Sequence, residues 1–237
     1  MQQRQTGRYH FPMKYEDITL GTFVDRPNRF VAHVSVDGKV ETVHVKNTGR
    51  CRELLVPGCP VVLERASNPN RKTPYDLIAT YKQRPGEAVE DASWLFNIDS
   101  QAPNKVVREW LEGQNYDLIK PEFTYGASRV DFMMERGNER YLMEVKGCTL
   151  EVDGIGYFPD APTERGVKHL RELAGAIAEG WHAAIAFVIQ MEGIAEVRPN
   201  IETHPEFGIA LDEACAAGVE VLFLQCEVEP GSLRIKT

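Results

Sequence analysis

An uninterrupted apolar run, AAIAFVI at residues 183–189, most restricts the folds open to this chain. The run is far too short to cross a bilayer, so it needs a protein environment on both of its faces. That is typical of an inner strand of a parallel sheet. A helical pattern precedes it at residues 163–179, another lies between Pro205 and Gly218, and an apolar strand pattern follows at residues 219–224. This alternation predicts right-handed crossovers in an α/β domain.

Two further strands are expected upstream, at residues 129–134 and 140–146, joined by the turn ERGNE. A helix is expected over residues 103–111, because Pro103 suits a first turn and the apolar residues recur at helical spacing. The second half of the chain therefore predicts an antiparallel hairpin that leads into the parallel part of a sheet.

The first part of the chain is predicted to form short strands with no long helix between them. The turn Asp37-Gly38 is a strong hairpin signal, because glycine accepts positive φ. A boundary is expected at Arg84-Pro85-Gly86, where the acidic stretch GEAVED begins. The expected fold class is therefore α+β with two domains: a small antiparallel, OB-like β-barrel at residues 1–85 and an α/β domain at residues 86–237. The barrel strands are expected near residues 18–24, 29–36, 40–45, 60–64 and 76–82.

The formal net charge of −8 is unevenly distributed. Residues 1–85 hold 14 Lys and Arg against 8 Asp and Glu, whereas residues 86–237 hold 13 against 27. A basic module favours polyanions, and small barrels bind single strands through basic grooves and stacked aromatic rings. A solvated surface of uneven charge is the alternative, and we expect Phe30 to pack in the core. The barrel residues expected to bind nucleic acid are Arg26, Arg29, Lys46, Arg50, Arg71 and Lys72.

The strongest chemical pattern is Asp131 with Glu144 and Lys146. Residues i and i+2 of a strand share a face, so Glu144 and Lys146 point the same way. Hairpin geometry sets Asp131 opposite residue 143 or 144, and in the second case all three side chains converge. Two carboxylates at one site repel each other unless a cation lies between them, and carboxylate oxygens suit Mg²⁺ or Mn²⁺. The alternative is an exposed hairpin that carries solvated charges.

A metal ion at this site would have further ligands within reach. Glu109 in the upstream helix could complete an acidic cluster, and the backbone carbonyl of Val145 is another candidate. Lys146 could orient a metal-bound water, which is what phosphodiester hydrolysis needs. The sequence thus indicates Asp131, Glu144 and Lys146 as catalytic candidates, and Asp131, Glu144, Val145 and Glu109 as candidate metal ligands.

The loop FPDAPTERG leads into the N-terminus of a predicted helix. Asp160 or Thr163 is expected to cap that helix. Its backbone amides, helped by Arg165 or Lys168, could also hold a phosphate. We expect His169, which lies among polar neighbours, to be a surface or packing histidine rather than a general base.

Long segments of the chain closely resemble the sugar fermentation stimulation protein A family. They include RPNRFVAHVSVDGKVETVHVKNTGRC in the first half, LFNIDSQAPNKVVREWL at the centre and GASRVDFMMERGNERYLMEVKGCT in the second half. The resemblance implies a DNA-binding protein with an OB-like N-terminal barrel. It also implies a C-terminal domain similar to the PD-(D/E)xK nuclease fold, with nuclease activity.

The resemblance extends to single residues of the site. Asp131 matches the aspartate of the family's SRxDF motif, and Glu144 and Lys146 match its EVK. Glu109 occupies the position of a helical glutamate found in the family. The chain has EVKGCT where relatives often have EVKNVT or EVKSVT, and no proline precedes the aspartate. In the second domain, the residues expected to contact nucleic acid are Arg129, Arg165 and Lys168.

Two functions remain open from the sequence. One is a nuclease that uses Mg²⁺ or Mn²⁺ to hydrolyse DNA or RNA, and the other is a non-catalytic DNA-binding protein that regulates sugar (maltose) metabolism. Five cysteines at irregular spacing, without a CxxC pair, suit a reducing cytoplasm. The start MQQRQTGRYH predicts no signal peptide, and no membrane partner is expected. A homodimer would suit an enzyme that cuts two strands, although no residue specifies one.

Overall fold

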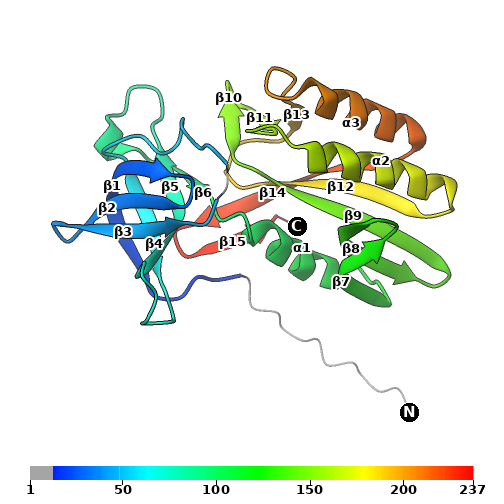
Figure 1. Ribbon diagram of the computed structural model, residues 1–237, viewed down its shortest axis with the longest axis horizontal. Coiled ribbons are helices and arrows are strands. Elements are labelled where there is room, and N and C mark those ends of the chain that lie inside the picture. The colour runs from blue at the N-terminus through cyan, green and yellow to red at the C-terminus, as the bar shows by residue number, and fades with distance from the viewer. Residues whose placement is uncertain (1–12, 48, 237) are drawn as a thin grey trace, which may run out of the picture.

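The computed structural model describes residues 13–47 and 49–236. Two sheet-based domains lie side by side, a β-barrel formed by the first part of the chain and an α/β domain formed by the rest (Figure 1). This is the architecture that the sequence predicts. The segment in which no signal peptide is expected lies outside the described residues. Within the described ranges, no helix is long and apolar enough to span a membrane.

The first domain is a closed five-stranded barrel, and all five strands lie where the sequence predicts them. Its strands are β1 (Ile18–Asn28), β2 (Val31–Val36), β3 (Lys39–Val45), β4 (Pro60–Arg65) and β5 (Tyr75–Lys82). β1 pairs with both β2 and β4, and a parallel pairing of β3 with β5 closes the barrel. Burial alternates along β2 because successive side chains point to opposite faces of a strand. The predicted OB-like barrel is therefore confirmed.

A short strand, β6 (Trp94–Asn97), connects the barrel to the second domain. It follows a short 3₁₀ helix, η1 (Val89–Asp91), and pairs with β5, so the barrel sheet continues beyond residue 85. The backbone N–H of Asn97 donates to the carbonyl of Gln190 at 3.0 Å, and Phe96 forms a β-bridge with Met191. The two domains thus share backbone hydrogen bonds as well as a chain connection.

The second domain is a mixed six-stranded sheet with helices on both faces. Its elements are α1 (Ala102–Glu112), β7 (Leu118–Tyr125), β8 (Ser128–Arg136), β9 (Glu139–Cys148), α2 (Glu164–Ala178), β12 (His182–Ile189), α3 (Pro205–Ala217), β14 (Glu220–Glu229) and β15 (Ser232–Ile235). The strand order is β15-β14-β12-β9-β8-β7. β12 runs parallel to both β9 and β14, whereas β8 is antiparallel to β9, as predicted. α2 and α3 cover one face of the sheet and α1 covers the other (Figure 1).

The apolar run at residues 183–189 forms most of β12, in which seven of eight residues are buried. Ile185 and Phe187 pack in the core beneath α2 and α3, whereas Ala186 and Val188 pack in the core beneath α1. Helices on both faces are the reason that this strand carries no polar alternation.

Several strands were not predicted from the sequence. β7 and β15 are edge strands, and a separate small sheet consists of β10 (Leu150–Val152), β11 (Ile155–Phe158) and β13 (Val197–Pro199). Strands of three or four residues carry too little periodic signal to be recognised. β7 is longer, but it is half exposed and mixes charged with apolar residues.

Candidate functional site

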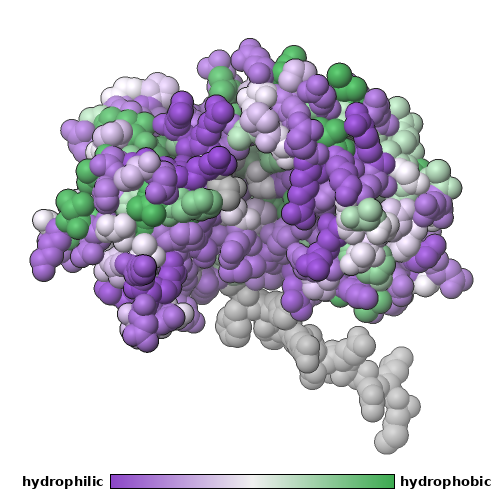
Figure 2. All heavy atoms as spheres, viewed as in Figure 1, coloured by the Kyte–Doolittle hydropathy of each residue, from purple (hydrophilic) through white to green (hydrophobic). Residues whose placement is uncertain are grey.

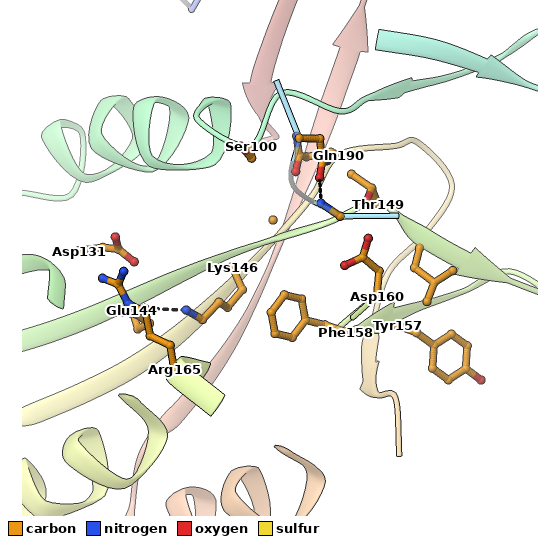
Figure 3. Close-up of a pocket in the computed structure, with 14 residues that line it drawn as sticks. Ser100, Asp131, Glu144, Lys146, Thr149, Tyr157, Phe158, Asp160, Arg165 and Gln190 are labelled. Atoms are coloured by element: carbon orange, nitrogen blue, oxygen red, sulfur yellow. Dashed lines mark hydrogen bonds and ion pairs between the residues drawn. The ribbon is translucent and has the colours of Figure 1, made fainter. Parts of the chain in front are cut away.

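A polar cleft of about 460 Å³ opens where the two domains meet. Asn47 and Gly49 of the barrel form part of one wall, and residues of the α/β domain form the rest. Figure 2 shows this hollow between the domains, with hydrophilic side chains along its rim. One end of the cleft groups Asp131, Glu144, Lys146 and Arg165 (Figure 3).

The hairpin of β8 and β9 brings the two predicted carboxylates opposite each other. Its paired register runs up to Phe132 opposite Met143, and one further step sets Asp131 opposite Glu144. Of the two partners that the sequence left open for Asp131, extension of this register favours residue 144. Both side chains line the cleft, so the convergence predicted from strand alternation is present.

Asp131 lies where the β8–β9 ladder ends, and its carboxylate takes the place of a strand partner. It accepts hydrogen bonds from the backbone N–H of Val145 and from Nδ2 of Asn104 in α1, both at 2.8 Å. Burial raises the pKa of Asp131, and the negative charge of Glu144 raises it further. These effects outweigh the opposing hydrogen bonds and the charge of Lys146.

Glu144 is 3% exposed and is held on one side only. Its Oε1 accepts a hydrogen bond from Lys146 Nζ at 2.6 Å and another from Nδ1 of His169. Its Oε2 is buried and has no hydrogen-bond partner. Burial alone would raise the pKa of Glu144, but the bond from His169 and the charge of Lys146 lower it below its ordinary value.

A hydrogen-bond chain reaches Glu144 from α2. Arg165 Nε donates to Nε2 of His169 at 3.3 Å, so that nitrogen is the acceptor and the proton resides on Nδ1, which faces Glu144. His169 is 3% exposed, so the expectation of a surface residue is wrong and that of a buried one is confirmed. The imidazole orients the carboxylate that the strand supplies.

The donor set of the carboxylate pair fits a hard divalent cation. A buried carboxylate oxygen without a partner is costly, and Glu144 Oε2 is such an atom beside a second carboxylate. Among the described residues, no group of three or more His, Cys, Asp and Glu side chains is arranged to hold a metal ion. Mg²⁺ is usually bound through one or two carboxylates, with water and substrate phosphates as its other ligands, and the pair suits that mode.

The other predicted metal ligands lie in different surroundings. Glu109 is absent from the residues that line the cleft, and its Oε2 accepts a hydrogen bond from the backbone N–H of Met13 at 3.0 Å. The peptide of Val145 lies next to the pair, because its N–H donates to Asp131. The α1 side chain that contacts the pair is therefore Asn104, which the sequence analysis did not select.

Three of the predicted nucleic-acid residues of the barrel make contacts with other parts of the protein. Arg26 donates to the carbonyls of residues 29, 47 and 50. Lys46 Nζ lies 2.9 Å from Oδ2 of Asp99, which is fully buried, and Arg71 makes two hydrogen bonds of 2.8 and 2.9 Å to Asp76. These cations stabilise the fold.

The remaining basic residues predicted to bind nucleic acid are exposed. Arg129 pairs with Glu122 at 3.3 Å, with both side chains exposed, and the exposed Lys168 pairs with the partly buried Glu172 at 3.7 Å. Exposed ion pairs of this kind are weak, so both cations remain available to an anion. The full exposed set is Arg29, Arg50, Lys72, Arg129, Arg165 and Lys168.

The two residues in the loop before α2 that were expected to cap this helix have different roles. Thr163 is the cap, because its hydroxyl accepts a hydrogen bond from the N–H of Gly166 at 3.1 Å. Asp160 instead accepts a hydrogen bond from the backbone N–H of Arg50 at 3.1 Å, across the domain junction. Asp160 thereby joins the barrel wall of the cleft to the α/β domain.

An OB barrel fused to a mixed α/β domain, with a carboxylate pair in the cleft between them, defines a class of two-domain proteins. Comparison with known families agrees with this division. Residues 24–89 match the family model described as the SfsA N-terminal OB domain, and residues 101–232 match that of the sugar fermentation stimulation protein RE domain. The chain belongs to the sugar fermentation stimulation protein family.

Individual relatives match over nearly their whole length. A sugar fermentation stimulation protein homolog from Desulfitobacterium hafniense is 52% identical over 224 residues, which cover 93% of this chain and 94% of the relative. A homolog from Ruminiclostridium cellulolyticum is 48% identical over 228 residues, covering 94% and 97%. Among solved structures, Pyrococcus furiosus SfsA in complex with Ca²⁺ superimposes with a TM-score of 0.80 at 26% identity, covering 96% of this chain and 97% of that one.

Proposed function

We propose that this protein is a nuclease that binds a divalent cation between Asp131 and Glu144 and hydrolyses phosphodiester bonds of DNA. The observation that carries the proposal is the buried, unpartnered Oε2 of Glu144 beside the carboxylate of Asp131. A protein that only binds DNA gains nothing from two carboxylates facing each other at one end of a cleft, because they repel both each other and the phosphates.

The roles of the residues follow from where their atoms lie. Asp131 and Glu144 would hold the cation, which, when bound, polarises a phosphate and lowers the pKa of a water molecule. Lys146 Nζ, in contact with Glu144, is placed to orient the attacking water and to stabilise charge that develops on the phosphate. The exposed guanidinium of Arg165 at the same end of the cleft is suited to bind a neighbouring phosphate.

His169 and Asn104 are positioning residues in this proposal. Each holds one carboxylate by a hydrogen bond and approaches it from the helix on its own face of the sheet. Such outer contacts fix the orientation of metal-binding carboxylates and tune their basicity.

Two similarities support the proposal. The Pyrococcus furiosus relative is described in complex with Ca²⁺, a hard cation that binds oxygen donors as Mg²⁺ and Mn²⁺ do. The motif around Asp131, Glu144 and Lys146 is similar to that of PD-(D/E)xK nucleases, in which the same residue types cut DNA. Mg²⁺ or Mn²⁺ is the cation we propose for catalysis.

The test is cleavage of end-labelled single- and double-stranded DNA and RNA with Mg²⁺ or Mn²⁺. We expect cutting by the wild type, none in EDTA, and none with Glu144→Gln, which keeps the volume of the side chain but removes its charge. Glu139→Gln is the matched control, because Glu139 is an exposed carboxylate at the start of the same strand. Wild-type cutting by Glu144→Gln would overturn the assignment of the site.

The alternative is a non-catalytic DNA-binding protein that acts on sugar metabolism. No cutting of any substrate by the wild type, with salt-sensitive DNA binding retained, would favour it. Calorimetric titration with Mn²⁺ then separates the two functions further, because an empty carboxylate pair would leave the α/β domain as scaffold alone.

A further inference from the structure

Phe30 lies on the surface of the barrel, although the sequence predicted it to pack in the core. Its exposure is 54%. Among the described phenylalanines, Phe223 is the only other exposed one, and its ring stacks on Phe187. A single exposed apolar residue needs no explanation, so its surroundings decide whether Phe30 has a role.

The backbone that carries Phe30 is held in place by a network of hydrogen bonds. Its N–H donates to the side chain of Asn28 at 2.9 Å, and its carbonyl accepts from the N–H of Val45 at 2.9 Å. One guanidinium, that of Arg26, donates to the carbonyls of residues 29, 47 and 50 at 2.7 to 2.9 Å. The turn between β1 and β2 is thereby joined to the segment after β3, and the exposed ring stands on an ordered base.

The same network locates Phe30 relative to the cleft. Asn47 lines the cleft. The guanidinium of Arg26 donates both to the carbonyl of Asn47 and to the carbonyl of Arg29, which precedes Phe30. The N–H of Arg50 is bonded to Asp160, which also lines the cleft. The backbone at Phe30 is therefore joined, through Arg26, to the segment that forms part of the barrel wall of the cleft.

The charges around Phe30 suit a polyanion. Arg29 precedes it directly, and Arg50 and Arg52 follow the segment that Arg26 ties to it; all three residues are exposed. Arg26, by contrast, is occupied by three carbonyls and forms part of the scaffold. An aromatic ring with cationic side chains beside it is the arrangement that binds single-stranded nucleic acid, whose bases stack while its phosphates meet the cations.

We propose that Phe30 is a stacking platform for an unpaired base of single-stranded DNA, with Arg29 and Arg50 contacting the adjoining phosphates. The inference rests on the proposed function. In it, the DNA bound at the nuclease site has a single-stranded segment that extends from the cleft across the barrel. An unpaired base is required, since the faces of a paired base are covered by its neighbours in the duplex.

The test is equilibrium binding of a fluorescein-labelled oligothymidylate of about 12 nucleotides, measured by anisotropy in EDTA so that no cutting occurs. Removing one stacking contact from a single-strand binder weakens binding by about 10- to 100-fold, and we expect a loss in this range for Phe30→Ala. Phe30→Trp is expected to retain binding, and its indole fluorescence is expected to be quenched by the unlabelled oligonucleotide more than wild-type fluorescence is.

Two controls make the loss specific to stacking. Leu20→Ala removes a comparably exposed apolar side chain (63%) from the same barrel and is expected to leave binding unchanged. A blunt duplex of the same length is expected to bind Phe30→Ala and the wild type equally. Arg29→Gln is expected to lower the slope of log affinity against log salt by about one, as loss of a single phosphate contact does.

The outcomes distinguish this inference from the nuclease assignment. Unchanged oligothymidylate binding by Phe30→Ala, or an equal loss for the duplex, overturns the stacking platform even if the protein cuts DNA. Phe30-dependent binding by a protein that cuts nothing supports the platform and overturns the nuclease. No binding of oligothymidylate by the wild type also overturns the platform.

Discussion

The basic residues of the barrel and the acidic pair of the α/β domain differ in their contacts. Several of the barrel cations are paired within the protein, whereas the two carboxylates line the cleft. The barrel has an excess of cations, but three of them are already paired within the protein. Lys46 and Arg71 bind carboxylates, and Arg26 donates to backbone carbonyls. The α/β domain is strongly acidic, yet Asp131 and Glu144 both face an open cleft.

The difference lies in what completes the hydrogen bonds of each group. Lys46 is matched by the buried Asp99, and Arg71 by Asp76, so neither needs a ligand. Glu144 retains a buried oxygen with no protein partner. A missing hydrogen bond does not by itself mark a functional residue, because Nε of Arg26 and Oε2 of Glu172 are also buried without a partner. Glu144 differs because its free oxygen lies beside a second carboxylate in the cleft.

The largest effect is expected at the carboxylate pair. Asp131→Asn removes one of the two charges that hold the cation, and loss of that interaction is expected to lower cleavage by about a thousand-fold, since a bound metal contributes several kcal/mol to the transition state. The measurement is single-turnover cleavage in Mg²⁺ together with calorimetric titration of Mn²⁺. Mn²⁺ affinity equal to that of the wild type would contradict a ligand role.

Lys46→Met tests the claim that this cation serves the fold. It leaves the buried Asp99 with hydrogen bonds from Tyr15 and Gln101 but without its counter-charge, and the expected loss of unfolding free energy is about 3 kcal/mol. Urea unfolding measures it. Lys72→Met, at an exposed site, is expected to change stability by less than about 0.5 kcal/mol.

The same variant also tests whether Lys46 contacts DNA. Its salt dependence of DNA binding is expected to equal that of the wild type, because the ammonium is already paired. A lower salt slope for folded Lys46→Met would show that Lys46 contacts phosphate after all.

His169→Asn tests the hydrogen-bond chain behind Glu144. Loss of the imidazole frees Glu144 Oε1 from one of its two partners, and the expected loss of metal affinity and of cleavage is about 10- to 100-fold. His182→Asn is the matched control, because His182 is exposed and stacks on Tyr141 in the same domain. Wild-type cutting by folded His169→Asn would show that Lys146 alone suffices to position the carboxylate.

The smallest effect is expected at the Arg71–Asp76 pair of the barrel. Burial alone would raise the pKa of Asp76, but the hydrogen bonds from Arg71 and His44 lower it below its ordinary 3.8. A carboxyl whose folded-state pKa is lowered stabilises the fold above its unfolded pKa, and that stabilisation is lost as the pH falls from about 4 through the folded value. The contribution at neutral pH is expected to be about 1–2 kcal/mol.

Asp76→Asn removes this titration. Urea unfolding between pH 7 and pH 3 is therefore expected to show a shallower loss of stability for the variant than for the wild type. Asp37→Asn, at the exposed turn between β2 and β3 of the same barrel, is expected to follow the wild-type curve. An unchanged pH profile for Asp76→Asn would place the acid sensitivity of the barrel elsewhere.

The predictable part of the molecule is the part encoded locally. Strand alternation alone places Glu144 and Lys146 on one face, and the hairpin turn restricts Asp131 to two possible partners. The apolar run at residues 183–189 predicts a doubly covered strand, because burial on both faces removes polar alternation.

The parts that escaped prediction depend on packing between distant elements. Asn104 and His169 reach the carboxylates only because α1 and α2 pack on opposite faces of the sheet, and a single sequence does not contain that arrangement. Lys46 and Arg71 were likewise predicted to bind nucleic acid from the charge of the first domain. A count of charges does not reveal that Asp99 and Asp76 pair with them in the folded protein. His169 has polar neighbours in the sequence, but at helical spacing it falls on the buried face with Leu170 and Leu173, and that placement was an available signal.

β9 is an interior strand, paired with β8 on one side and with β12 on the other. Its amides are therefore among those expected to exchange with deuterium only when the whole domain opens. Because Glu144 and Lys146 are mounted on this strand, local fluctuations of loops and edges leave their spacing unchanged. On heating, the spacing of Glu144 and Lys146 is therefore expected to be lost together with the tertiary structure of the domain, and not before it.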